Sequence, residues 1–511
     1  MEASRTKKSV TNTTVSFISQ LIIILLGFIS RRVLIYSVGV QYLGINGLMT
    51  NILTIFSLAE SGIGTAIGYS LYKPLAENNI EKVKSLMRFY RNTYRILAGM
   101  TAIVGLLFYP FLPIFLKDNT APDANIIYFL FLGSSVCSYL WSYKVTLNSS
   151  DQNKYLYTIA NTLTQILVLI VKVFILYFTQ NYILYLCIEL GSTLIKNIIF
   201  SIIMDKRYPY LKDKSVKKLD EVEKNTLFVN IKSLFFGKIG YILSQCSDNL
   251  VISSIVSITS VGMYSNYTTL ISSVSGFVTT FSSGVTASMG NLIACETKEK
   301  SYEVYKKIDF INYWLYTFSA ICLICLMEPF IMIWLGDDYV LEKGILIIAV
   351  LTFYLKGINS GIEIAKNAAG LYHPDRFVPI IEAALNLVIS IVLAFRIGLL
   401  GVLIGTFVSF LCCSFWTKPY FVYRDVFNIE FSKYIRWEGK KIVIALVMGC
   451  VLYVFEMMIS FQSLYIGFIV KAISVVILSN LLLMIVFHNT REFEYIKQLV
   501  HVIFNKFIFY K

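Results

Sequence analysis

The sequence is poor in charged residues, which make up 15% of its 511 residues, whereas hydrophobic residues make up 56%. A soluble domain usually contains about 25% charged residues, so this chain has too few polar groups to cover a surface in water. We therefore expect the lipid bilayer to be its main solvent. No stretch is long and polar enough to form a soluble domain, which argues against a nucleic-acid-binding protein despite the net charge of +14.

Other signatures are missing as well. The nine cysteines are scattered through apolar runs, and the C-x-x-C of Cys322 and Cys325 has no partner pair of Cys or His, so we predict no metal or redox site. No G-x-x-x-x-G-K-[ST] motif occurs. We thus predict no cofactor, and a proton or sodium gradient, or the substrate gradient itself, would drive any transport. The first apolar run is too long for a signal-peptide core, so we expect no cleavable signal.

Long apolar runs are abundant. Fourteen runs approach or exceed the roughly 20 residues that a helix needs to cross a bilayer. They are 13–37, 43–70, 92–116, 126–148, 155–178, 183–204, 226–254, 262–293, 308–334, 344–365, 377–395, 401–417, 442–459 and 464–488. The sequence therefore predicts an all-α, multi-pass membrane protein with 14 transmembrane helices.

Lysine and arginine indicate how these helices are oriented. The segments on the amino-terminal side of the membrane, including 205–225 and 418–441, carry 32 of them, whereas the alternate loops carry 3. Positively charged loops stay in the cytoplasm, so we predict that both termini are cytoplasmic. The loop 205–225 is expected to lie against anionic lipid head groups.

The sequence also repeats at a spacing of 218 to 219 residues. YPFLPIFLKD (109–118) aligns with EPFIMIWLGD (328–337), and VGVQYLGINGLMTNIL (38–53) aligns more weakly with VSITSVGMYSNYTTLI (256–271), which pairs Gly44 with Gly262. Each repeat would hold six helices, an even number, so both would enter the membrane in the same sense.

We predict two parallel six-helix lobes around a central cavity. The predicted parts are the lobes 1–204 and 226–423, the cytoplasmic connector 205–225, two further helices with their preceding segment in 424–488, and a cytoplasmic tail 489–511.

Seven cations lie deep within the predicted helices, where a charge that faces lipid costs about 2.5–3.5 kcal/mol. They are Arg31, Arg32, Arg95, Lys172, Lys196, Lys238 and Lys356. We expect them to line a cavity that receives an anion, and phosphate or pyrophosphate matches the paired donors of arginine. For each residue by itself, a structural ion pair is an equal alternative.

Four acids are candidates for balancing these cations or for coupling transport to an ion: Glu60, Asp248, Glu363 and Glu382. We expect Glu60 to neutralise Arg95, with a proton or sodium site as the alternative. Gly64 and Gly68 follow Glu60 in a G-x-x-x-G that allows close helix contact. A further acid, Glu189, is expected to pair with a neighbour such as Lys172.

Several segments together carry a family resemblance through their order and spacing. They are RVLIYSVGVQYLGINGLM (32–49), LAESGIGTAIGYSLYKPLAENN (58–79), SDNLVISSIVSITSVGMYSNY (247–267), SMGNLIACE (288–296), PFIMIWLGDDYVL (329–341) and the run 367–406. The chain resembles bacterial polysaccharide flippases (Wzx type) of the multidrug/oligosaccharidyl-lipid/polysaccharide exporter superfamily. The resemblance covers nearly the whole chain and is weakest after about residue 430.

The resemblance implies a fold like that of multidrug and toxic compound extrusion (MATE) transporters, with a V-shaped cationic cavity. It also implies a substrate, an oligosaccharide repeat unit on undecaprenyl pyrophosphate, which moves from the inner to the outer leaflet by alternating access. It implies a monomer in the bacterial cytoplasmic membrane that serves surface polysaccharide assembly, such as O-antigen or capsule. Its expected partners are membrane lipids, a polysaccharide polymerase and other assembly proteins, and no nucleic acid.

The resemblance also bears on single residues. The family arginine of the first helix maps to Arg32 and the aspartate of the seventh to Asp248, so a contact between the two is expected. Four polar residues are candidates for meeting sugar hydroxyls, with helix–helix contacts as an equal alternative: Asn46, Asn161, Gln165 and Asn386.

Three other functions compete with this one. A multidrug exporter of the same fold takes organic cations and would need an acid-rich or aromatic cavity. A flippase for lipid II, the peptidoglycan precursor, would share the chemistry but have a different sequence pattern. A polymerase or ligase of the same pathway would need a large extracytoplasmic loop with reactive residues, and every predicted outer loop is short, so we expect no enzyme.

Overall fold

The computed structural model describes residues 2–116, 123–151, 153–213, 219–221, 223–225, 227, 242–243, 246–371, 374–459 and 461–498. The regular structure among these residues is entirely helical, as the sequence predicted. The chain divides into two compact units, 1–262 and 263–511, and each unit has its own core of buried apolar side chains. The lobe boundaries predicted above, 1–204 and 226–423, stay predictions.

The first unit contains a run of helices that begins near the amino terminus. They are α1 (Glu2–Val38), α2 (Val40–Phe56), α3 (Leu58–Ala76), α4 (Ile80–Phe108), η1 (Tyr109–Phe111), α5 (Leu112–Phe115), α6 (Ala124–Ser150), α7 (Lys154–Thr179), α8 (Tyr182–Arg207), η2 (Pro209–Lys212) and η3 (Ile252–Val256). Gly39 separates α1 from α2 with a φ of 95°, a backbone conformation that glycine adopts without a steric penalty.

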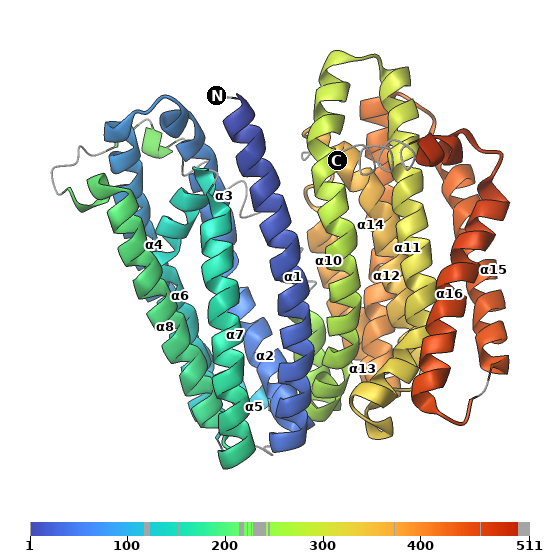
Figure 1. Cartoon of the computed structure of the whole chain (residues 1–511), viewed down its shortest axis with the longest axis horizontal. Helices are drawn as coiled ribbons and strands as arrows, with labels where there is room; N and C mark the ends of the chain where they lie inside the picture. The colour runs from blue at the N-terminus through green and yellow to red at the C-terminus, as the bar shows by residue number, and fades with distance from the viewer. Residues whose placement is uncertain are drawn as a thin grey trace, which may run out of the picture. The chain divides into compact units, whose positions relative to one another are not determined.

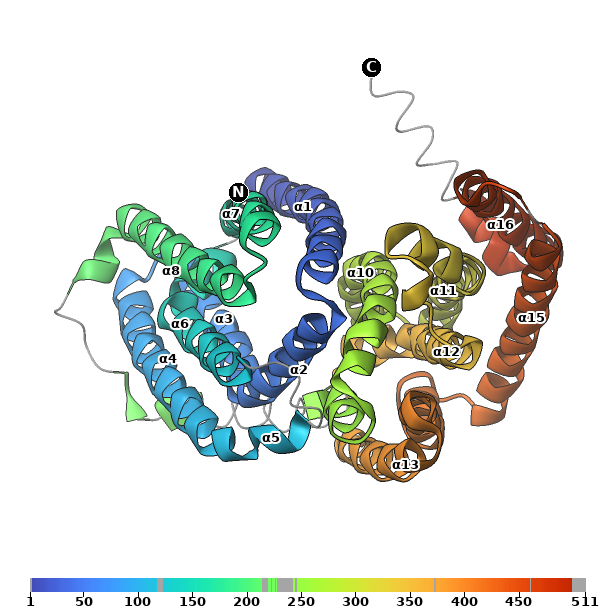
Figure 2. The same ribbon diagram turned by 90° about the horizontal axis from the view of Figure 1, so that it is seen from below.

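Neighbouring helices of the first unit are arranged so that α7 packs between α1 and α8, while α6 packs against α4 and α8 (Figure 2). The core between α3, α4, α6 and α8 is rich in tyrosine, including the fully buried Tyr90, Tyr94 and Tyr139. The faces of α1, α7 and α8 that do not pack in this core carry polar side chains and surround the cavity described below.

The second unit continues with longer helices. They are α10 (Ile258–Cys295, which starts in the first unit), α11 (Lys298–Trp334), η4 (Asp337–Tyr339), α12 (Lys343–Ala368), α13 (Val378–Cys412), α14 (Ser414–Phe421), η5 (Val422–Phe427), α15 (Phe431–Met458), α16 (Leu464–Phe487) and a last helix, 491–498. Helix α11 is central, because it packs against α12, α15 and α16 (Figure 1).

Ten helical segments of the described chain are long and apolar enough to cross a membrane. The expected second span, 43–70, is interrupted at Ser57, where α2 ends and α3 begins. The expected spans 377–395 and 401–417 are joined in α13, which is kinked at Ile397 and Gly398. The expected seventh span, 226–254, lies mostly outside the described residues, so the number of fourteen stays a prediction.

The helix surfaces confirm that the protein is a multi-pass membrane protein. On α7, large apolar side chains are exposed at helical spacing: Leu163, Leu167, Ile170, Phe174 and Phe178. On α16 the exposed stripe is Ile466, Ile469, Ile473, Ile477 and Leu481. Soluble monomers rarely expose apolar stripes of this size, whereas lipid solvates them without cost.

Candidate functional site

A partly polar cavity of about 460 Å³ lies between α1, α2, α7 and α8 of the first unit. Most of its polar lining consists of uncharged hydroxyl and amide side chains, which can donate and accept hydrogen bonds. The lining residues are Ile23, Leu26, Gly27, Ser30, Asn46, Thr164, Gln165, Val168, Leu169, Lys172, Tyr185, Glu189, Ser192, Thr193 and Lys196. Two of the seven predicted cations, Lys172 and Lys196, are therefore brought together in one cavity.

Lys172 is held rigidly in this cavity by two neighbours on α8. Its Nζ lies 2.7 Å from Glu189 Oε2 and 4.0 Å from the centroid of the Tyr185 ring. The Lys172 side chain is 9% exposed and that of Glu189 is 48% exposed, so the carboxylate is the more accessible partner. The predicted pairing of Glu189 with Lys172 is confirmed, and Lys172 carries little uncompensated charge.

Lys196 is the second cation of the cavity, and its hydrogen-bond partner is an amide rather than a carboxylate. Its Nζ donates to Asn161 Oδ1 at 2.9 Å and lies 5.8 Å from the Tyr157 ring, and it forms no ion pair among the described residues. A neutral amide orients an ammonium group but does not cancel its charge. Lys196 therefore makes this cavity attractive to an anion.

The rest of the polar lining is organised by hydrogen bonds between helices. Asn46 donates to the Tyr182 hydroxyl at 3.1 Å, and the hydroxyls of Ser30 and Tyr185 lie 3.2 Å apart. Of the polar residues singled out in the sequence, Asn46 and Gln165 line the cavity, and Asn161 supports it through Lys196. Asn386 instead donates to Thr406 in the second unit.

The arginines of α1 lie on different sides of the helix. Arg31 is half-buried beside Tyr185, next to Ser30 of the lining. Arg32 is exposed and lies over its neighbour Tyr36, with 5.6 Å between the guanidinium carbon and the ring centroid. Successive residues point about 100° apart around a helix, so these two adjacent arginines face different environments.

The predicted contact between Glu60 and Arg95 is not formed. Glu60 faces the hydroxyls of Tyr139 and Tyr94, and no ion pair joins it to Arg95 in the described structure. Tyr94 lies on the buried face of α4, and Arg95, one residue later, is exposed. Arg95 does not line the cavity either. The sequence places the two residues at similar depth, but α4 is rotated so that Tyr94, and not Arg95, faces Glu60.

The remaining predicted residues are dispersed. In the second unit, Lys356 Nζ lies 5.8 Å from the Phe410 ring, Glu363 pairs with Lys418, and buried Glu382 accepts a hydrogen bond from Ser414. Asp248 lies in a short helical segment that runs into η3, and its contact with Arg32 stays a prediction. Lys238 lies outside the described residues.

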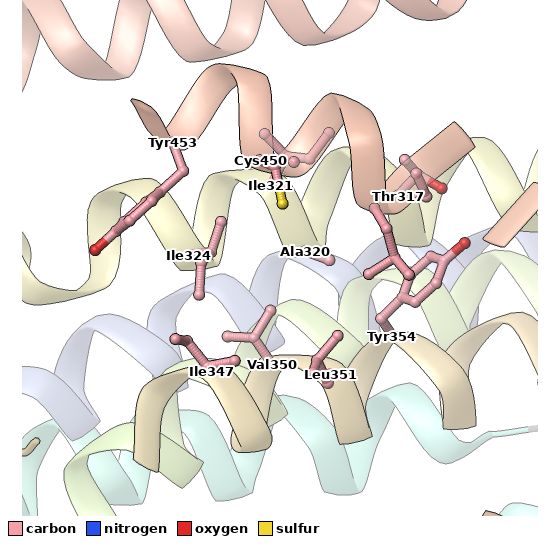
Figure 3. Close-up of a pocket in the computed structure, with 13 residues that line it drawn as sticks. Thr317, Ala320, Ile321, Ile324, Ile347, Val350, Leu351, Tyr354, Cys450 and Tyr453 are labelled. Carbon is pink, nitrogen blue, oxygen red and sulfur yellow. The ribbon is translucent and has the colours of Figure 1, made fainter. Parts of the chain in front are cut away.

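A second cavity, of about 320 Å³, lies between α11, α12 and α15 (Figure 3). Its lining is almost entirely apolar, with Ile321, Ile324, Val350 and Cys450 facing the space, and it carries no charged side chain. Because this cavity offers no cation to an anionic ligand, the cavity of the first unit is the candidate functional site.

Several lining residues were not found from the sequence, namely Ser30, Thr164, Tyr185, Ser192 and Thr193. Serine, threonine and tyrosine are common in membrane helices and give no signal singly. A helical pattern was nevertheless present on α8, where the polar lining residues recur at spacings of three or four from Tyr185 to Lys196.

Comparison with solved structures defines the fold. The structure is similar to the inward closed conformation of the lipid II flippase MurJ, with a TM-score of 0.64 over 94% of this chain and 99% of that chain at 15% identity. It is also similar to a mutant of the Vibrio cholerae MATE transporter VcmN, with a TM-score of 0.57 over 86% and 99% at 15% identity. The fold is thus that of MurJ-like and MATE-like membrane transporters, as predicted.

The family follows from the sequence. Residues 9–287, more than half of the chain, match the family described as polysaccharide biosynthesis protein. The chain therefore belongs to that family, which confirms the resemblance found in its motifs. A search of curated proteins gave no match.

Proposed function

We propose that the protein is a flippase that moves undecaprenyl-pyrophosphate-linked oligosaccharide repeat units from the inner to the outer leaflet of the bacterial cytoplasmic membrane. The observation that carries the proposal is the cavity of the first unit, where Lys196 forms no ion pair with any described residue and lies among amide and hydroxyl side chains. The ammonium group suits a pyrophosphate, and the neutral polar groups suit sugar hydroxyls.

The comparisons support a lipid-linked saccharide as the cargo. The family is described by polysaccharide biosynthesis, and one solved relative of the fold is described as a lipid II flippase. A lipid II-type precursor would present the same pyrophosphate and is therefore the alternative that the experiment must separate. Translocation breaks no covalent bond, so we propose a transporter by alternating access and no enzyme.

The proposal is tested by translocation in proteoliposomes that contain the full chain. The cargoes compared are undecaprenyl pyrophosphate carrying an oligosaccharide, lipid II, and an organic cation of the kind that multidrug exporters take. We expect the first to move fastest, and Lys196→Ala to lower its rate at least tenfold. The matched control is Lys206→Ala, which removes an exposed lysine from α8, the helix that carries Lys196.

Equal rates for the protein and for empty liposomes would reject the flippase. Faster movement of lipid II than of the oligosaccharide carrier would identify the peptidoglycan precursor as the cargo. Movement of the organic cation alone would favour the multidrug exporter.

The other predicted cations enter the proposal as further contacts for the anionic head group. Arg32 is accessible on α1, so Arg32→Ala should abolish export, and Arg32→Lys should restore it only partly because a point charge lacks the paired donors. Arg31, beside the lining residue Ser30, is proposed to add to the positive potential of this cavity, and Lys172 is proposed to do so when an anion replaces Glu189. Arg95, Lys238 and Lys356 are proposed as anion contacts outside this cavity, and Asp248, Glu363 and Glu382 as counter-charges to such cations.

We further propose that both termini are cytoplasmic, and that the protein acts as a monomer with a polysaccharide polymerase and other assembly proteins in making O-antigen, capsule or a similar polymer. The orientation is tested in a cysteine-free variant with single cysteines at position 212 or 338, both exposed. An impermeant reagent applied to intact cells should label position 338 and spare position 212. The reverse result would invert the topology.

A further inference from the structure

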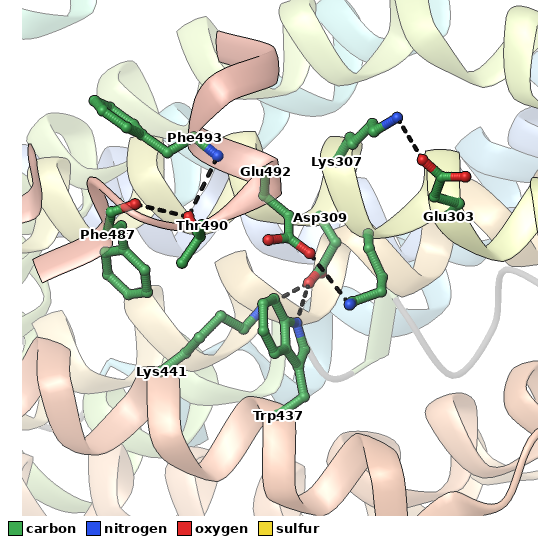
Figure 4. A network of polar contacts seen from close by, with 10 residues as sticks. Glu303, Lys307, Asp309, Trp437, Lys441, Phe487, Thr490, Glu492 and Phe493 are labelled. Atoms are coloured by element: carbon green, nitrogen blue, oxygen red, sulfur yellow. Dashed lines mark hydrogen bonds and ion pairs between the residues drawn. The ribbon is translucent and has the colours of Figure 1, made fainter. Parts of the chain in front are cut away.

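A second charged cluster, in the second unit, takes no part in the proposed anion site. Asp309 on α11 is 1% exposed, and Glu438 and Lys441 on α15 are 3% and 1% exposed. Lys441 Nζ lies 2.6 Å from Asp309 Oδ2 and 2.5 Å from Glu438 Oε1. Figure 4 shows Lys441 and Trp437 reaching Asp309 from α15.

The charges in this cluster do not balance. Two carboxylates share one ammonium group, so the fully ionised cluster would bury one surplus negative charge. A buried charge without a partner is strongly unfavourable, because it loses its hydration and gains nothing in return. One proton on either carboxylate would make the cluster neutral.

The hydrogen bonds indicate which carboxylate takes the proton. Asp309 Oδ2 accepts hydrogen bonds from Lys441 Nζ at 2.6 Å and from Trp437 Nε1 at 3.3 Å, so it is stabilised as an anion. Glu438 Oε2 is buried and has no hydrogen-bond donor among the described residues. Both carboxyl groups contact the same Lys441 Nζ, so they lie beside each other. We therefore assign the proton to Glu438.

The surrounding charges do not supply the missing cation. Lys306 pairs with Glu492 of the last helix, and Lys307 pairs with Glu303 on α11. On α12, Glu363 pairs with Lys418 of α14 and Lys366 pairs with Asp375, which precedes α13. On η5, Arg424 pairs with Asp425. Arg436 and Lys440 on α15 are exposed. The uncharged polar group that contacts the cluster is Trp437, whose Nε1 donates to Asp309. The hydroxyl of Tyr305, one turn before Asp309 on α11, is buried without a hydrogen-bond partner among the described residues.

We propose that Glu438 and Asp309 form a proton-binding site, and that the proton bound by Glu438 is exchanged during transport. A proton fits this site better than sodium, because the Lys441 ammonium lies within 2.6 Å of both carboxylates and would repel a metal ion. The inference deepens the proposed function by naming the coupling ion, and its coupling role rests on that function.

The proton itself is tested by infrared spectroscopy of the purified full-length protein in lipid nanodiscs. We expect a carbonyl stretching band of a protonated carboxylic acid that disappears in Glu438→Gln. It should also disappear in Asp309→Asn, because Lys441 then needs Glu438 as its counter-ion. The matched control is Glu492→Gln, which changes a neighbouring ion-paired glutamate and should keep the band. A band that persists in Glu438→Gln overturns the proposal.

The coupling is tested by transport of the oligosaccharide carrier in proteoliposomes with and without a pH gradient. We expect the gradient to change the wild-type rate at least threefold, and the rate of Glu438→Gln to be the same in both conditions. Lys196→Ala should lose transport and keep the infrared band. If the wild type moves no lipid-linked saccharide, the proposed function fails while the infrared result still decides the proton site. A gradient response that survives in Glu438→Gln overturns the coupling role.

Discussion

Gly44 on α2 and Gly262 on α10 lie backbone against backbone within the first unit. A Cβ atom on Gly44 would stand 3.1 Å from the Gly262 nitrogen, and one on Gly262 would stand 3.0 Å from the Gly44 nitrogen. The internal repeat aligns these same two glycines. Equivalent positions of the two repeats thus meet at a contact that only a residue without a side chain permits.

This contact predicts a large effect of Gly44→Ala. The new Cβ would lie 2.0 Å from the Ile258 carbonyl oxygen, a backbone atom that cannot move alone. We expect separation of α2 from α10 and a severalfold lower amount of protein in the membrane, as immunoblotting would measure. Gly47→Ala is the control, because its Cβ would meet Val261 at an ordinary 3.5 Å. Normal amounts of Gly44→Ala would show that the close approach is dispensable.

The ion pair of Lys172 and Glu189 predicts a gain of anion affinity. Glu189→Gln removes the carboxylate that competes with an incoming anion for Lys172. We expect inorganic pyrophosphate to bind the detergent-solubilised protein about tenfold more tightly, which corresponds to about 1.4 kcal/mol, as calorimetry would measure. Glu296→Gln, which disrupts an exposed pair with Lys300, should leave the affinity unchanged. Weaker binding in Glu189→Gln would place the anion away from Lys172.

The separation of Glu60 from Arg95 predicts additive effects. If the two formed a buried ion pair, the double change Glu60→Gln with Arg95→Gln would be milder than either single change. Because they share no contact, the losses should instead add. The measurement is export of the lipid-linked glycan, corrected for the amount of each variant in the membrane. Better export by the double variant than by either single variant would show that Glu60 and Arg95 form an ion pair in some state of the transport cycle.

The kink of α13 predicts a stability effect at Gly398. This residue has φ 59° and ψ −135°, a region that other residues enter at a cost of about 1–3 kcal/mol. Gly398→Ala should therefore lower the midpoint of thermal unfolding. Gly449→Ala on α15 is the control, since its Cβ would meet nothing within 4 Å and alanine favours a helix. An unchanged midpoint for Gly398→Ala would mean that alanine adopts the backbone conformation of the kink without a measurable cost.

The sequence by itself determined the class of protein, the helices and the family. A chain with few charges and many long apolar runs requires lipid as its solvent, because it has too few polar groups to cover a surface in water in any fold. The pairing of Lys172 with Glu189 was also predictable, because the two residues are 17 positions apart on helices joined by a short turn. Such contacts between neighbouring segments depend on little besides chain connectivity.

Only the tertiary structure decided which faces of the helices meet. It placed Lys196 in the cavity and Arg95 on an exposed surface, although the sequence had placed both within predicted membrane helices. It also brought Asp309 to Lys441 across 132 positions, whereas the sequence had assigned Lys441 to the cytoplasmic segment 418–441. The physical reason is helix rotation: a residue's depth is read along the chain, but its partner is set by how the helix packs against distant neighbours.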